Sequence, residues 1–166
     1  MSKARISREN ASAAHFVTLT TGNWHYVFDR HDRWRILADS LAFLQHNRGL
    51  RLYAYVFMLN HLHMIIRAPD TAACLRDFKR HTAHEIRRNM EAKERGLLKL
   101  FTDETGAFRF WKSGNQPKII ETESFFLQKI NYIHFNPVRK GYVPHPECWL
   151  WSSACPQSPL KTEPVW

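Results

Sequence analysis

A strand-turn-strand pattern between two predicted helices constrains the fold more than any other feature of this chain. Residues 52–58 and 62–68 are rich in strand-forming residues, and Leu59-Asn60 separates them. Apolar residues recur at helical spacing over residues 32–47 and again over residues 71–94. The pattern therefore predicts an antiparallel hairpin with a helix before it and a helix after it.

A further β-rich run over residues 15–21 precedes the first helix, so the predicted order is strand, helix, strand, strand, helix. A basic connection, a short pair of strands and a last helix should follow. This order predicts an α+β fold, a ferredoxin-like antiparallel sheet with packed helices. We expect one domain over residues 1–166, with residues 96–107 as its most flexible segment and residues 156–166 as an extended tail.

Two histidines at strand spacing begin the second strand of the hairpin. Alternate residues of a strand share a face, so His61 and His63 point together and could hold one ion. Tyr132 and Asn136 lie four residues apart in a predicted helix, on one face with Gln128. Packed on the sheet, that face would bring a nucleophile, a third ligand in Asn136 and possible support from Gln128. A chance His-x-His pair and a core tyrosine remain the structural alternatives.

The chain is strongly basic, which favours a polyanionic partner. It carries 24 Lys and Arg against 15 Asp and Glu, for a formal net charge of +9. The second predicted helix has a basic stripe that would contact phosphates or, alternatively, form a solvated face. Trp111 lies in a run that interleaves rings with cations, and we expect it to stack on bases, although buried strand positions would explain its neighbours equally well. The residues of the stripe are Arg76, Lys79, Arg80, Arg87 and Arg88.

Three cysteines without metal-type spacing indicate reduced thiols rather than a disulfide framework. No apolar leader follows Met1, and no apolar run reaches the length of a membrane span. These features predict a cytoplasmic protein.

Two sequence blocks resemble the signature motifs of the single-tyrosine HUH transposases, and they are closest to the REP-associated tyrosine transposase branch. The first block is Asn60-His61-Leu62-His63 with the apolar residues after it, and the second runs from Tyr132 through Asn136-Pro137 to Val143. Weaker similarity covers residues 15–24, 110–117 and 151–154. The chain departs from the pattern at Gln116, where some relatives carry histidine, and in its shorter, proline-rich tail.

This resemblance implies a metal-dependent enzyme that nicks and rejoins single-stranded or hairpin DNA. Tyr132 would form a covalent 5′-phosphotyrosine, Mg²⁺ or Mn²⁺ would bind at the histidines, and Arg139 and Lys140 would lie beside the scissile phosphate. DNA is the expected partner, no membrane is involved, and the protein should be a monomer or homodimer. Two alternatives remain open: a metal-dependent nuclease that uses activated water, and a non-catalytic DNA-binding regulator.

Overall fold

Four antiparallel strands form the sheet at the centre of the molecule. The computed structural model describes residues 5–164, so the extreme amino terminus and the last two tail residues, on which parts of the leader and tail predictions rest, lie outside the described residues. The strands are β1 (His15–Thr20), β2 (Arg51–Phe57), β3 (His61–Arg67) and β4 (Lys118–Ile119), in the spatial order β2-β3-β1-β4. This is the strand order of a ferredoxin-like sheet, and the predicted fold class is confirmed.

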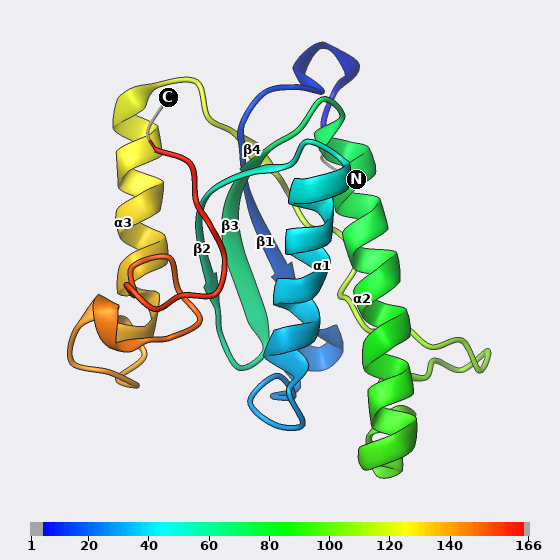
Figure 1. The fold of residues 1–166 in the computed structure, drawn as a ribbon. Coiled ribbons are helices and arrows are strands. Elements are labelled where there is room, and N and C mark those ends of the chain that lie inside the picture. The colour runs from blue at the N-terminus through cyan, green and yellow to red at the C-terminus, as the bar shows by residue number, and fades with distance from the viewer. Residues whose placement is uncertain (1–4, 165–166) are drawn as a thin grey trace.

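Helices cover both faces of this sheet. The helices are α1 (Arg33–Asn47), α2 (Thr71–Lys93) and α3 (Glu123–Arg139). Figure 1 shows α1 and α2 side by side on one face and α3 on the other. The side chains of β3 divide accordingly, since Leu62 and Met64 join the core under α1 and α2 while Ile65 joins the core under α3. His61 and His63, at odd positions like Ile65, therefore face α3.

The connection between α2 and α3 differs from the prediction. Residues Arg95–Phe101 form a 3-10 helix instead of a flexible segment, and Phe101 is buried in the core under α2. The predicted pair of strands is reduced to the two-residue β4 and isolated bridges such as Thr21 with Trp111. Phe101 therefore holds the first part of this stretch against the domain, whereas residues 102–107 lie mostly at the surface.

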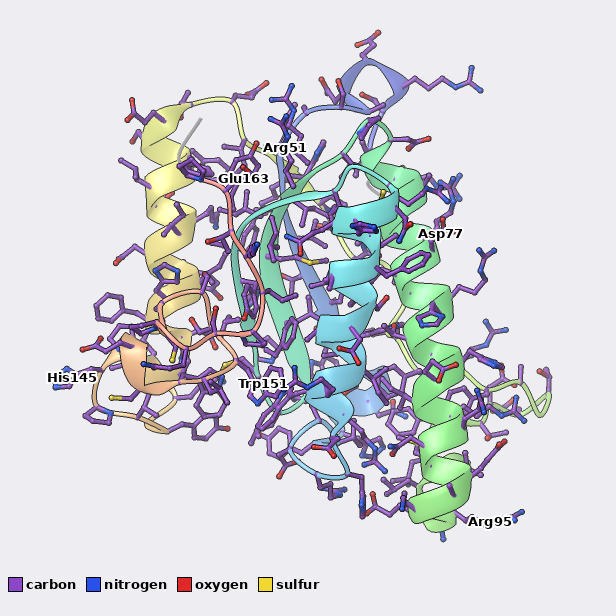
Figure 2. The ribbon with its side chains drawn as sticks, in the orientation of Figure 1. Arg51, Asp77, Arg95, His145, Trp151 and Glu163 are labelled. Atoms are coloured by element: carbon purple, nitrogen blue, oxygen red, sulfur yellow. The ribbon has the colours of Figure 1, made fainter. Side chains whose placement is uncertain are left out.

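The carboxyl-terminal tail packs on β2. Leu160 is buried in the core, and the Glu163 amide donates to the Leu52 carbonyl at 2.7 Å. Figure 2 shows Glu163 near Arg51 at the start of β2 and Trp151 near the other end of that strand. In the described tail, turns and bends occur within residues 156–160 and none over residues 161–164, and the tail covers a sheet edge.

The turn between β2 and β3 is held by three separate segments. Trp34 Nε1 of α1 donates to the Met58 carbonyl at 2.9 Å. The amides of Val27 and Phe28 both donate to the Leu59 carbonyl, at 3.1 and 3.2 Å, and the Thr21 amide donates to the Asn60 carbonyl at 2.9 Å. Every carbonyl of this turn is therefore used, and the start of β3 is fixed in position.

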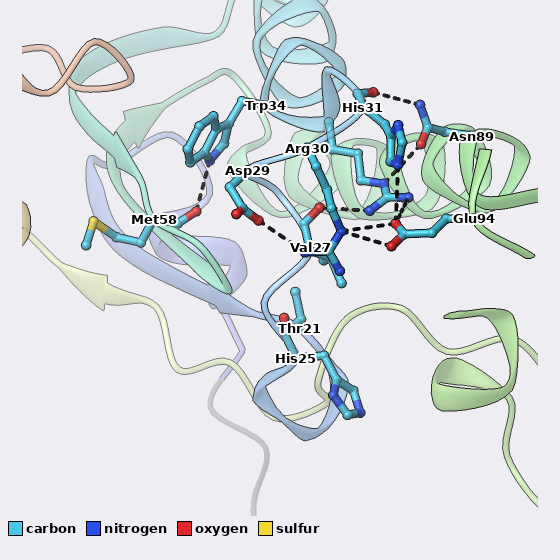
Figure 3. A network of polar contacts seen from close by, with 11 residues as sticks. Thr21, His25, Val27, Asp29, Arg30, His31, Trp34, Met58, Asn89 and Glu94 are labelled. Atoms are coloured by element: carbon cyan, nitrogen blue, oxygen red, sulfur yellow. Dashed lines mark hydrogen bonds and ion pairs between the residues drawn. The ribbon is translucent and has the colours of Figure 1, made fainter. Parts of the chain in front are cut away.

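A buried arginine, Arg33, joins the start of α1 to the end of α2. Figure 3 shows its partners Val27, Asn89 and Glu94 in the surrounding network of polar contacts. Arg33 is fully buried, donates from Nη1 to the Val27 carbonyl at 3.1 Å, and donates from Nε to Asn89 Oδ1 at 3.0 Å. Its Nη2 lies 2.8 Å from Glu94 Oε2, an ion pair whose angle falls outside that of a hydrogen bond. Arg30 Nε pairs with the same carboxylate at 3.0 Å. The network thus anchors the loop that leads from β1 to α1.

Within residues 5–164, no helix combines the length and apolar character that a bilayer crossing requires. Cys74, Cys148 and Cys155 are all free thiols, in agreement with the reading of the sequence.

Candidate active site

The histidine pair lies at the start of β3 on the face that α3 covers. His61 pairs in register with Thr20 of β1, and His63 pairs with Thr18 of β1 and Val56 of β2. The two imidazole centroids are 4.9 Å apart. His63 is buried, whereas His61 is partly exposed. The predicted strand spacing therefore places both rings at one point of the sheet surface.

Hydrogen bonds at Nδ1 orient both rings. His61 Nδ1 lies 2.7 Å from Asn60 Oδ1, and the other end of that amide, Nδ2, donates to the Trp24 carbonyl at 3.1 Å. Because a carbonyl only accepts, it fixes the orientation of the Asn60 amide, so Oδ1 accepts a hydrogen bond from His61 Nδ1. Nε2 of His61 then carries the lone pair. His63 Nδ1 lies 2.7 Å from the Thr18 hydroxyl, which can rotate to accept in the same way.

Both imidazoles are held in the neutral form. Burial, with a smaller contribution from Lys140, lowers the pKa of His61 to about 4, although the nearby Asn136 side chain opposes this shift. The pKa of His63 is lowered to about 3, and burial is the largest cause. Electrostatic repulsion from His61, Lys129 and Arg139 adds to the effect of burial. Neutral imidazole is the form that binds a metal ion.

Helix α3 brings Tyr132 and Asn136 to the pair. The Thr122 side chain caps the helix by accepting from the Phe125 amide at 3.1 Å, and Phe126 and Ile133 pack into the core beneath it. The ring centroid of Tyr132 is 5.2 Å from that of His63. Tyr132 is 40% exposed, so its phenol can meet a substrate from solvent.

The Asn136 side chain is buried beside His61, and its oxygen lacks a partner. It is 5% exposed, and Oδ1 accepts no hydrogen bond of normal geometry among the described residues, although the amide is close enough to favour protonation of His61. An unpaired buried carbonyl oxygen is unfavourable unless something else binds to it.

These donors fit a divalent ion. Two neutral imidazoles with Nε2 available and one unpaired amide oxygen make three neutral ligands, which leaves positions for phosphate and water. Among residues 5–164, no group of three or more His, Cys, Asp or Glu side chains is arranged to hold a metal. A site here would therefore depend on Asn136 as its third protein ligand.

Positive charge surrounds the phenol. Lys129 Nζ is 5.2 Å from the centroid of the Tyr132 ring, and the Arg139 guanidinium is 4.6 Å from it. Arg139 also donates to the Tyr132 carbonyl, and Lys140 lines the cavity that contains the histidines. Sequence reasoning missed Lys129, which its position three residues before Tyr132 on the same helical face could have indicated.

Three adjoining cavities lead along the surface to this point. The first, of about 300 Å³, contains His61, His63, Tyr132 and Asn136. The second, of about 460 Å³, shares Thr20 and Tyr132 with it and carries the cations Lys112, Lys118 and Lys129. The third, of about 470 Å³, shares residues 113–115 with the second and reaches Arg76 and Lys79 on α2. Together they form a cationic groove that ends at Tyr132.

Comparison with known proteins was informative only at the level of structure. No family model matches the chain, and no curated protein matches its sequence. A REP-associated tyrosine transposase solved in complex with a REP hairpin aligns with 92% of this chain and 82% of its own, with 18% identity and a TM-score of 0.70. The chain has the fold of that transposase. A proposed transposase from Deinococcus radiodurans R1 aligns with 80% of this chain and 95% of its own at 19% identity, with a TM-score of 0.46.

On this fold, the basic stripe of α2 divides into two parts. Arg76 and Lys79 line the cationic groove, and Lys79 Nζ donates to Asn115 Oδ1 at 3.2 Å. The other three arginines pair with acids of the same helix: Arg80 with Asp77, Arg87 with Glu91 and Arg88 with Glu85. The stripe therefore contains negatively charged as well as positively charged side chains, because Asp77 and Glu85 lie within a turn of the arginines.

Trp111 does not provide the expected stacking surface. It is 9% exposed, packs against Phe28 and Phe110, and donates from Nε1 to the Thr82 hydroxyl at 3.0 Å. A base cannot reach a ring in this position, so the expectation that Trp111 stacks on bases is wrong. The exposed tryptophan near the site is Trp24, which the sequence reasoning used only as part of a motif.

Gln128 is not brought to the site. Its side chain is exposed, and it lines neither of the two cavities that contain Tyr132. The Gln128 side chain therefore lies outside the cavity that contains the histidines.

Proposed function

We propose that this chain is a metal-dependent nickase and strand transferase of the REP-associated tyrosine transposase type, acting on single-stranded or hairpin DNA. The observation that supports it best is the convergence of a solvent-accessible tyrosine, two neutral histidines and an unpaired amide oxygen in one cavity. The cationic groove that leads to this cavity suits a DNA backbone, and the neighbour of the same fold is bound to a REP hairpin.

In the proposed reaction, Tyr132 Oη attacks a backbone phosphorus. A bond forms between Oη and phosphorus while the bond to the 3′ oxygen breaks; the phenolic proton leaves to water, and the 3′ oxygen takes up a proton. The product is a 5′-phosphotyrosine and a 3′-hydroxyl, so the enzyme keeps the energy of the broken ester and needs no ATP to rejoin strands.

The residues of the site divide the work of this step. His61, His63 and Asn136 would hold Mg²⁺ or Mn²⁺, which would supply positive charge to offset the negative charge of the phosphate. Lys129 and Lys140 place additional cations where the phosphate enters. Arg139 steadies the end of α3 through the Tyr132 carbonyl and holds its charge over the phenol ring.

The nucleophile is tested by trapping the covalent adduct. We expect wild-type protein with a single-stranded or hairpin oligonucleotide and Mn²⁺ to give a band of protein-linked DNA on a denaturing gel. Tyr132→Phe should remove this band and leave DNA affinity nearly unchanged. Tyr53→Phe, a change at a tyrosine that does not line this cavity, is the matched control and should keep the band. An adduct that persists in Tyr132→Phe would reassign the nucleophile.

The metal is tested by calorimetric titration with Mn²⁺ alone. His61→Ala and His63→Ala should each remove most of the binding heat, and the double variant should cost little more, because the two ligands act together. Asn60→Ala should weaken binding by about 10- to 100-fold, as expected when the residue that orients a ligating histidine is lost. Unchanged binding in the double histidine variant would place the ion elsewhere. His46→Ala, at an exposed histidine of α1, is the control.

A further inference from the structure

Three large aromatic side chains stand at the opening of the cavity that contains Tyr132 and are not used by the reaction described above. Trp24 is 58% exposed, Tyr26 is 57% exposed and Tyr142 is 40% exposed. All three line that same cavity. Exposed rings beside cations are the combination with which proteins stack unpaired bases.

The backbone holds Trp24 in its exposed position despite an unfavourable conformation. Asn23 and Trp24 both have left-handed φ angles, 53° and 55°, which L-residues with large side chains rarely adopt. Such strain persists only where surrounding contacts impose it, and it concentrates at functional sites. Here the Trp24 amide donates to the Thr21 carbonyl at 3.2 Å, and the neighbouring Gly22 amide donates to the Phe110 carbonyl at 2.7 Å.

Cations flank the aromatic opening on the path of the groove. Lys112 Nζ lies 3.9 Å from the centroid of the Trp24 ring, and Lys112 also lines the adjoining cavity. Lys140 lines the cavity of the histidines, together with Tyr142. Tyr142 in turn stacks on Trp149, with centroids 5.7 Å apart, which supports its ring from behind. A nucleotide at this opening would find apolar rings for its base and cations for its phosphates.

We propose that this opening is a nucleobase-binding site, in which the unpaired base next to the scissile phosphate stacks on Trp24 beside the side chains of Tyr26 and Tyr142. The proposal rests on the function proposed above and adds to it a means of selecting the phosphate. Because a paired base must first be unstacked from its duplex, an unpaired nucleotide occupies the site at a lower cost in free energy. The aromatic rings therefore favour cleavage outside the stem of a hairpin.

Asn60 links the base site to the histidines. One end of its amide holds the Trp24 carbonyl and the other end holds His61 Nδ1. The ring that would receive the base and the imidazole that would bind the metal are thus fixed by a single side chain. A base stacked on Trp24 would place its phosphate at a set distance from His61 and Tyr132, which is what in-line attack requires.

The test uses the full chain carrying Tyr132→Phe, so that DNA remains uncleaved, and measures affinity by fluorescence anisotropy. A single abasic nucleotide is moved along a single-stranded oligonucleotide. Removal of the stacked base should weaken binding by about 5- to 150-fold at one position, since stacking contributes on the order of 1–3 kcal/mol. Trp24→Ala should weaken binding of intact DNA by a similar factor and abolish the abasic effect at that position. Trp24→Tyr should restore much of both.

Phe43→Ala is the matched control, because Phe43 is an equally exposed ring on α1 outside the groove. It should bind every oligonucleotide as the parent does. An abasic effect of the same size in parent and Trp24→Ala would overturn the proposal, as would equal affinities of Trp24→Ala and Phe43→Ala for intact DNA. These readings do not need cleavage, so a failure of the wild-type protein to form an adduct would count against the proposed function alone.

Discussion

At the scale of single residues, the site depends on side chains that are kept neutral or unpaired. His61 and His63 are neutral because they are buried among cations, and Asn136 keeps an oxygen without a partner. Each arrangement is unfavourable for the protein without a ligand. The site therefore lowers the free energy of unfolding. This loss should become larger at low pH, where the neutral histidines of the site resist protonation.

The unfolding free energy should fall as pH drops below about 6.5. In the unfolded chain each histidine takes up a proton near pH 6.5, whereas in the folded chain His61 and His63 stay neutral until about pH 4 and 3. The unfolded state then binds more protons, and each histidine lowers stability by at most about 1.4 kcal/mol per pH unit, less for the partly exposed His61.

Urea unfolding between pH 7 and 5 in EDTA measures this slope. His61→Gln/His63→Gln should show a shallower decline than wild type, though not a flat one, because burial also lowers the pKa of His15 and His134. His46→Gln, at an exposed position, should keep the wild-type slope. Parallel curves for the double variant and wild type would show that the pair is protonated in the folded state.

At the scale of elements, α2 presents different surfaces along its length. Its amino-terminal part borders the cationic groove through Arg76 and Lys79, while Arg80, Arg87 and Arg88 pair with acids of their own helix. A surface ion pair contributes little to stability, but it leaves less charge for a phosphate. The two parts of the helix should therefore differ in their effect on DNA binding.

Neutralising the groove side should flatten the salt dependence of binding. Arg76→Gln/Lys79→Gln should reduce the slope of log affinity against log salt by about 1.4, since each phosphate contact on single strands contributes about 0.7. Arg87→Gln/Arg88→Gln should change it much less. Fluorescence anisotropy over a salt series measures both, and equal flattening by the two pairs would show that DNA covers the whole helix.

Prediction from the sequence succeeded where periodicity is strong. The first three strands and the first two helices lie within one residue of their expected bounds, because alternation and helical spacing directly reflect which side chains face a core. It failed for Trp111, which is buried, and it did not identify Trp24 as an exposed ring. Both tryptophans stand near cations and turns in the sequence, and only packing decides which one is buried. The pairing of Arg80, Arg87 and Arg88 was not predicted, because the acids among these cations were judged too few to offset them.

At the scale of the whole molecule, stability depends on an ion pair far along the chain from the site. Arg33 is fully buried, and Glu94 is the carboxylate that pairs with it. Glu94→Gln would leave the guanidinium charge buried without an anion, which should cost about 3 kcal/mol, the lower end of the usual range, because Glu94 is 29% exposed.

Urea unfolding at neutral pH measures this loss. Glu91→Gln removes a surface pair with Arg87 on the same helix and should change stability by less than about 1 kcal/mol. If the two variants were equally stable, solvent would be reaching Arg33, and the loop from β1 to α1 would be anchored by its hydrogen bonds alone.

The hydrogen-bonded carbonyls of the turn between β2 and β3 restrict where this protein can gain residues. Hairpin tips usually accept insertions, because they project into solvent and make few contacts with the rest of the protein. Here Met58, Leu59 and Asn60 are each held by another segment, so an added residue would break several bonds and displace His61 at once. Insertions are expected instead near Gly106, because a Cβ atom added to this glycine would have no neighbouring atom within 4 Å.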